Sequence, residues 1–157
     1  MTVREVAPEV DTDTLLAGAQ FADAFRIEIG DRDLDARGAA ERMMARQPRW
    51  AAMLLSLRNV LVTPLRLKTS GASPVAPRDM IGIFPVVSAT PSRIVAGFND
   101  RHLDFRVVVD VKPAGDLRQV TATTLVLTHN RLGRSYLAII MPFHRLIVPA
   151  MLRQIAA

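Results

Sequence analysis

Residues 135–151 read SYLAIIMPFHRLIVPAM, an apolar stretch that two prolines and a His-Arg pair interrupt. At about 100° per residue, the arginines and both prolines of segment 131–155 fall on one stripe of a helix, and Asn130 is a suitable N-cap. The pattern therefore predicts one long C-terminal helix. Its polar stripe comprises Arg131, Arg134, Ser135, Ala138, Pro142, Arg145, Pro149 and Arg153, and its apolar arc comprises Leu132, Tyr136, Ile139, Ile140, Phe143, Leu146, Ile147 and Met151.

This helix is expected to cover an apolar surface rather than to cross a membrane. Its apolar run contains His144 and Arg145 and falls short of about 20 clean residues. A helix lying on lipid is the alternative, but the apolar arc is too wide for a helix that only rests on a surface. Each proline lacks the N–H that would bond the carbonyl four residues before it. On the outer stripe water can bind these carbonyls, and the helix bends convex outward. Because the arc exceeds the usual core stripe, the helix either packs on two sides or also lines a cavity or a dimer contact.

Composition indicates a globular protein of the cytoplasm. A chain of 157 residues most simply forms one domain over 1–157, with an extended N-terminal segment over 1–20 and the core over 21–155. The chain has no cysteine, which excludes disulfides and cysteine nucleophiles, and no secretory signal is visible. The net charge is +5, but no dense basic run appears, so we expect no nucleic-acid partner.

Before the C-terminal helix, the apolar periodicity changes from that of a strand to that of helices and back. Inward-facing residues of the first predicted helix are Ala36, Ala39, Ala40 and Met43. The predicted elements are a strand over 23–29, a helix from Asp33 or Asp35 to Arg46, a helix over 48–62, a loop over 68–79, and strands over 81–87, 93–98, 102–111 and 119–129.

The last four strands are joined by short connectors, which imply antiparallel hairpins. Pairing Phe98 with Leu103, and Val87 with Ile94, makes one face of this meander apolar and leaves the other face to solvent. The predicted order is β-α-α-β-β-β-β-α, an α+β fold with the C-terminal helix on the apolar face. That face comprises Ile81, Ile83, Val87, Ile94, Ala96, Phe98, Leu103, Phe105, Val107 and Val109, and the polar face carries Arg93, Asp104, Arg106 and Asp110.

Few residue patterns carry chemistry. The three histidines lack metal-ligand spacing such as H-E-x-x-H, and no nucleotide-binding glycine motif or nucleophile elbow occurs, so we expect no metal and no cofactor. His144 lies at the edge of the apolar arc, either as a general base or hydrogen-bond donor in a pocket or as a histidine bonded to a neighbouring backbone group or carboxylate. His102, Asp104 and Arg106 share one side of a strand; they form an acid–base or anion-binding row or, more simply, exposed charge pairs. His129 lies at a strand end.

Three stretches of the chain resemble a known bacterial family. That family is catalogued as domain of unknown function 2867, and it looks like a branch of the START-like, pollen-allergen-like (SRPBCC) superfamily. The resemblance implies a helix-grip fold, in which a curved antiparallel sheet, usually of seven strands, wraps round a long C-terminal helix and often leaves an apolar cavity. Periodicity predicts five strands. The stretches are RQPRWAAMLLSLRNVLV (46–62), IGIFPVVSATPSRIVAGFNDRHLDFRV (81–107) and TLVLTHNRLGRSYLAIIMPFHRLIVPAMLRQ (124–154).

This fold leads to a ligand-binding hypothesis. A small apolar or amphipathic molecule is expected to bind between the sheet and the C-terminal helix, because such sites need apolar walls with one or two polar groups. Three alternatives stay open: the same residues fill a solid core, a cyclase- or hydratase-like enzyme uses the cavity with His144 and Tyr136 as catalytic candidates, or the chain is a homodimerising interaction domain. The expected lining is Phe25, Trp50, Met53, Phe98, Phe105, Tyr136, Ile140, Phe143 and His144.

Overall fold

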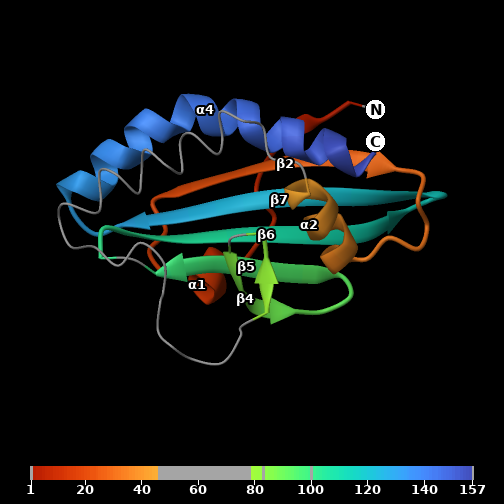
Figure 1. Cartoon of the computed structure of the whole chain (residues 1–157), viewed down its shortest axis with the longest axis horizontal. Helices are drawn as coiled ribbons and strands as arrows, with labels where there is room; N and C mark the ends of the chain where they lie inside the picture. The colour runs from red at the N-terminus through yellow and green to blue at the C-terminus, as the bar shows by residue number, and fades with distance from the viewer. Residues whose placement is uncertain (1, 46–78, 83, 100, 157) are drawn as a thin grey trace.

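The structure is a computed structural model that describes residues 2–45, 79–82, 84–99 and 101–156. The described part of the chain forms a curved sheet of seven antiparallel strands, in the order β1-β2-β7-β6-β5-β4-β3, with helix α4 lying along it (Figure 1). This α+β arrangement is compatible with a helix grip. The strands are β1 (Arg4–Val6), β2 (Phe21–Ile29), β3 (Met80–Ile81), β4 (Phe84–Ala89), β5 (Arg93–Asn99), β6 (Leu103–Ala114) and β7 (Leu117–Thr128), and the helices are α1 (Thr12–Leu15), α2 (Ala36–Met44) and α4 (Arg131–Ile155).

The predicted order of elements is incomplete at two places. Residues 1–20, expected to be extended, contain β1, which pairs with β2, and the short helix α1. The single strand predicted over 81–87 is two strands, β3 and β4. Three of the missed or split elements, β1, α1 and β3, have only three, four and two residues, too few for a periodic pattern. The helix predicted over 48–62 and residues 68–78 of the predicted loop lie outside the described residues.

The β6–β7 hairpin is the centre of the sheet and is longer than predicted. Its pairing begins at Ala114 opposite Leu117 and continues to Leu103 opposite Thr128. The connecting turn contains Gly115, whose φ of 63° is readily adopted by glycine. The strands therefore extend into segment 112–118, which was expected to be a connector.

The predicted register is wrong in detail on both sides of β5. Phe98 pairs with Phe105 rather than with Leu103; this slip of two residues keeps every side chain on its predicted face. Ile94 pairs with Ala89 rather than with Val87, because the β4–β5 register shifts between residues 86 and 88. Val87 is consequently 56% exposed instead of lying on the apolar face. The predicted partner Ile83 lies outside the described residues.

One face of the sheet is covered by α2 and the C-terminal half of α4. The main core lies between this face and the two helices. Helix α2 begins at its N-cap Asp35, whose carboxylate accepts a hydrogen bond of 2.7 Å from the backbone N–H of Gly38. The four residues predicted to face inward from α2 are all buried. The core comprises Phe25, Ile27, Ile29, Leu34, Ala36, Ala39, Ala40, Met43, Ile81, Ile94, Val109, Val111, Val120, Ala122, Val148, Met151, Leu152 and Ile155.

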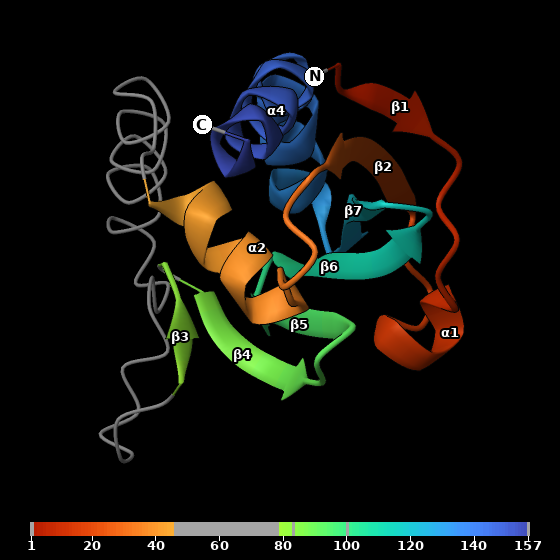
Figure 2. The same cartoon turned by 90° about the vertical axis from the view of Figure 1, so that its right-hand side faces the viewer.

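The opposite face of the sheet is not the solvent-exposed face that was predicted. Val108, Thr123 and Leu125 on this face are completely buried. The N-terminal segment lies on this side: α1 is on the side of the sheet away from α2 (Figure 2), and Glu9 forms ion pairs with Arg26 and Lys112. The predicted polar residues are accommodated by pairing: Arg93 binds both carboxylate oxygens of Asp110, at 2.6 and 3.0 Å. This hydrogen bonding raises the pKa of the Arg93 guanidinium above its ordinary value.

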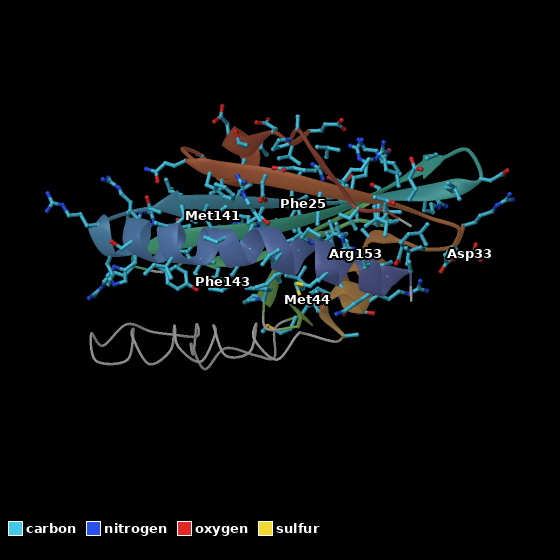
Figure 3. All side chains as sticks on the ribbon, turned by 90° about the horizontal axis from the view of Figure 1, so that it is seen from above. Phe25, Asp33, Met44, Met141, Phe143 and Arg153 are labelled. Carbon is cyan, nitrogen blue, oxygen red and sulfur yellow. The ribbon has the colours of Figure 1, made fainter. Side chains whose placement is uncertain are left out.

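Helix α4 arches over the sheet (Figure 1), and the residues of its polar stripe are exposed, apart from Pro149. Pro142 is exposed and Pro149 is half-buried. The apolar arc divides into two parts: one part faces the sheet and lines a pocket, and the other part is exposed. Met141 and Phe143 leave the helix on different sides (Figure 3). The exposed apolar residues of α4 are Leu132 (43%), Ile139 (59%), Phe143 (41%) and Leu146 (65%). Among the described residues, α4 alone is long and apolar enough to cross a membrane, a test that core helices of soluble proteins also pass.

The start of α4 is held by Asn130. Its Oδ1 accepts a 2.9 Å hydrogen bond from the backbone N–H of Gly133, and its Nδ2 donates to Nδ1 of His102 at 2.6 Å. Replacing Asn130→Ala should lower the free energy of unfolding by about 1 kcal/mol, the usual effect of losing an N-cap. Asn130→Asp keeps the acceptor for Gly133 but loses the donor to His102, so it should cost less than Asn130→Ala without reaching the wild-type value. Urea unfolding followed by circular dichroism checks both values, and equal losses in the two variants would contradict the capping role.

Candidate functional site

A pocket of about 110 Å³ lies between the sheet and the N-terminal half of α4. It is partly open to solvent, and its wall is mainly apolar. Strands β2, β4, β5, β6 and β7 form the floor, and α4 forms the roof. The lining residues are Phe21, Phe84, Phe98, Leu103, Phe105, Thr124, Val126, Tyr136, Leu137, Ile140, Met141 and His144.

The floor of the pocket is built by strand register. Phe21, Val126, Phe105 and Phe98 are consecutive partners across four neighbouring strands, so their side chains lie on the same face in one row. Phe84 of β4 continues the row, because its ring centroid lies 6.1 Å from that of Phe98 and 5.2 Å from that of Phe105. The row gives the pocket a rigid aromatic floor.

One wall of the pocket is polar. Asp23 of β2 and Thr124 of β7 are direct partners and point to the same face as Phe21, since side chains two residues apart share a face. His144 approaches from α4, and its Nε2 lies 3.2 Å from Oδ1 of Asp23. The ring of Phe21 packs edge-on against the imidazole, at a centroid distance of 6.0 Å. The two side chains of the pair are only 14% and 9% exposed.

This His–Asp pair leaves two polar atoms without a hydrogen bond. Oδ2 of Asp23 is buried and has no partner. Nδ1 of His144 likewise has no partner among the described residues, while the imidazole lines the pocket. A carboxylate accepts, so Nε2 of His144 carries the proton of the shared hydrogen bond. In the neutral imidazole Nδ1 is therefore a hydrogen-bond acceptor, on a side chain that lines the pocket.

Comparison with known protein families identifies the chain. The family described as "Protein of unknown function (DUF2867)" matches residues 15–151. The chain belongs to the DUF2867 family. This match includes every residue that lines the pocket. Neither the curated proteins nor the solved structures contain a match to the chain.

In this DUF2867 protein, the residues expected to line the cavity are distributed over several places. Five of them meet at the pocket: Phe98, Phe105, Tyr136, Ile140 and His144. Phe25 lies instead in the main core, and Phe143 lies on α4 outside the pocket lining. Trp50 and Met53 lie outside the described residues.

Sequence reasoning missed several residues of the site, above all Asp23 and Phe21. The predicted strand began at residue 23, whereas β2 begins at Phe21. A signal for Asp23 was present, because it alternates with Phe25 and Ile27 and so places an acid on the apolar face of the strand. The other unpredicted lining residues are Phe84, Leu103, Thr124, Val126, Leu137 and Met141.

Each residue of the second polar row suggested by the sequence has at least one structural partner, while Nε2 of His102 and Nε of Arg106 are buried without a hydrogen bond to the described residues. His129 Nε2 lies 3.0 Å from Oδ1 of Asp104, and His102 receives the hydrogen bond from Asn130. Arg106 donates to the backbone carbonyls of Phe98 and of the adjacent Phe105. These contacts are all within the protein, between the row and its neighbouring strands and the start of α4. The described residues contain no group of three or more His, Asp or Glu side chains that could hold a metal ion.

Proposed function

We propose that this DUF2867 protein is a START-like helix-grip domain that binds a small apolar molecule carrying one polar group, in the pocket beneath α4. The observation that carries the proposal is the pocket itself, which has an aromatic floor, an aliphatic roof and His144 on one wall. Apolar walls with a few placed polar groups are typical of small-molecule sites. The seven antiparallel strands curved along a C-terminal helix support the START-like assignment.

The volume of the pocket argues for a ring-sized occupant. An apolar cavity of about 150 Å³ is known to take up benzene, and this pocket of about 110 Å³ is similar. At roughly 24 cal/mol per Å³, an empty cavity of this size costs about 2–3 kcal/mol of stability, which a bound ligand would recover. Because the pocket is partly open, a longer molecule can extend from it into solvent.

Two ring probes that differ in one group test the proposal. We expect p-cresol and p-xylene both to bind, and p-cresol to bind about fivefold more tightly, because its hydroxyl can donate to Nδ1 of His144 and one hydrogen bond contributes about 1 kcal/mol. Leu137→Trp, which fills the pocket, should abolish binding of both probes. Ile139→Trp places the same ring on the 59% exposed side of α4 and should leave both affinities unchanged. Titration calorimetry gives the affinities.

Circular dichroism of the two tryptophan variants serves as the folding control. If neither probe binds to the wild-type protein, or if the folded Leu137→Trp variant binds as tightly as the Ile139→Trp variant, the proposed function is wrong. If the same residues instead fill a solid core, neither probe will bind to the wild-type protein.

A further inference from the structure

The pair of His144 and Asp23 suggests a chemical activity for the pocket. We propose that His144 is a general base that takes a proton from an apolar molecule bound beneath α4, and that Asp23 is its positioning residue. The inference rests on the proposed function, because the reacting molecule must first occupy the pocket. Its substrate class is a small, mainly apolar carbon acid, such as a carbonyl compound with a C–H bond next to the carbonyl.

The two imidazole nitrogens of His144 differ in their hydrogen bonding. Nε2 is used by Asp23, while Nδ1 has no partner among the described residues and belongs to a side chain that lines the pocket. An orienting carboxylate on one nitrogen fixes the tautomer in which the other nitrogen carries the lone pair. Phe21 holds the ring from its edge, so the base is presented to the pocket in one orientation.

Only one carboxylate oxygen of Asp23 is hydrogen-bonded to the described residues. Asp110 is equally buried, at 8% exposure, yet both of its oxygens accept hydrogen bonds from Arg93. In the part of the chain that the structure describes, no arginine pairs with Asp23 and its Oδ2 has no hydrogen-bond partner. A buried carboxylate with an orphaned oxygen is costly, and an apolar pair would be the cheaper way to fill this space. The cost is explained if the negative charge stabilises the imidazolium that appears when His144 accepts a proton.

The proposed step is a simple proton transfer. The C–H bond of the substrate breaks, its proton forms a bond to Nδ1 of His144, and the electron pair stays on the substrate, where it forms the enolate. The imidazolium remains hydrogen-bonded through Nε2 to Asp23 and later returns the proton to the same or another carbon. This proton transfer requires no oxidant, reductant or metal.

The probe for this step is 5-nitrobenzisoxazole, a small aromatic carbon acid. When the base removes the C3 proton, the C–H electron pair forms the third bond of the nitrile and the N–O bond breaks. The electron pair of the N–O bond stays on the oxygen of the coloured phenolate. We expect kcat/KM of the wild-type protein to exceed that of His144→Gln by about 100-fold, within the usual range for a positioned base. Asp23→Asn should lower kcat by about tenfold with KM unchanged, because it disturbs the tautomer and not the pocket.

The matched control is His129→Gln, which removes the histidine of the other His–Asp pair, outside the pocket, and should leave the rate unchanged. Binding of p-xylene to each variant shows separately that the pocket is intact. Equal rates in the wild type and in a His144→Gln variant that still binds p-xylene would overturn the base and leave the proposed function standing. If His144→Gln loses p-xylene binding, inhibition of the wild-type reaction by p-cresol is measured instead. We expect p-cresol to lower the rate, because it occupies the same pocket. A rate that p-cresol does not affect overturns the inference.

Discussion

Gly133→Ala is expected to destabilise the protein by about 3 kcal/mol, at the upper end of the usual cost of overpacking. Gly133 lies in the first turn of α4 and is buried. A Cβ at this position would lie 2.1 Å from the carbonyl oxygen of His102 and 3.0 Å from its carbonyl carbon. These are backbone atoms, which cannot rotate away as a flexible side chain can. The first turn of α4 must therefore lift from the β5–β6 connection, or that connection must move.

The matched control for this variant is Gly30→Ala. A Cβ at Gly30 would meet nothing within 4 Å, and the residue is exposed, so we expect a change of less than about 0.5 kcal/mol. Urea unfolding of both variants gives the comparison. A Gly133→Ala variant as stable as Gly30→Ala would show that α4 does not approach the β5–β6 connection this closely.

Leu152→Ala is expected to have the second large effect, a loss of about 3 kcal/mol in the free energy of unfolding. Leu152 is completely buried and belongs to the core that α4 shares with α2 and the sheet. Truncating such a leucine removes its burial and leaves a cavity, which together cost about 2–5 kcal/mol. The position lies in the C-terminal part of α4, away from the pocket residues, so binding of p-cresol should survive wherever the variant is folded.

Leu146→Ala provides the same truncation on the same helix. Its side chain is 65% exposed, and we expect a change within about 0.5 kcal/mol. Thermal or urea unfolding that found both leucines equally costly would contradict the division of the apolar arc into a buried and an exposed part.

Much of the sheet could be predicted from local patterns, and its details could not. Alternation identified β2, β5, β6 and β7 because these strands have seven to twelve residues. The pattern alone fixes the face of each side chain but leaves the register open by multiples of two, as the Phe98 pairing demonstrates. The cover over the second face comes from segment 7–20, whose sequence has little periodicity.

For the candidate site, the sequence indicated His144 but not its partner. Asp23 is 121 residues away along the chain, and the pairing follows only once β2 and α4 are placed in space. Phe21 was missed because the predicted strand began two residues too late, and element boundaries are poorly defined by local patterns. Phe84 was missed because the strand predicted over 81–87 divides into β3 and β4. Long-range arrangement therefore carries most of the information about this pocket.

Nuclear Overhauser effects from bound p-cresol test most directly whether the space beneath α4 receives a small molecule. With methyl-labelled protein, the account predicts contacts from the ring protons of p-cresol to the methyl groups of Leu137, Ile140 and Met141, which line the pocket. Contacts confined to Ile139 and Leu146, on the exposed side of the same helix, would contradict it.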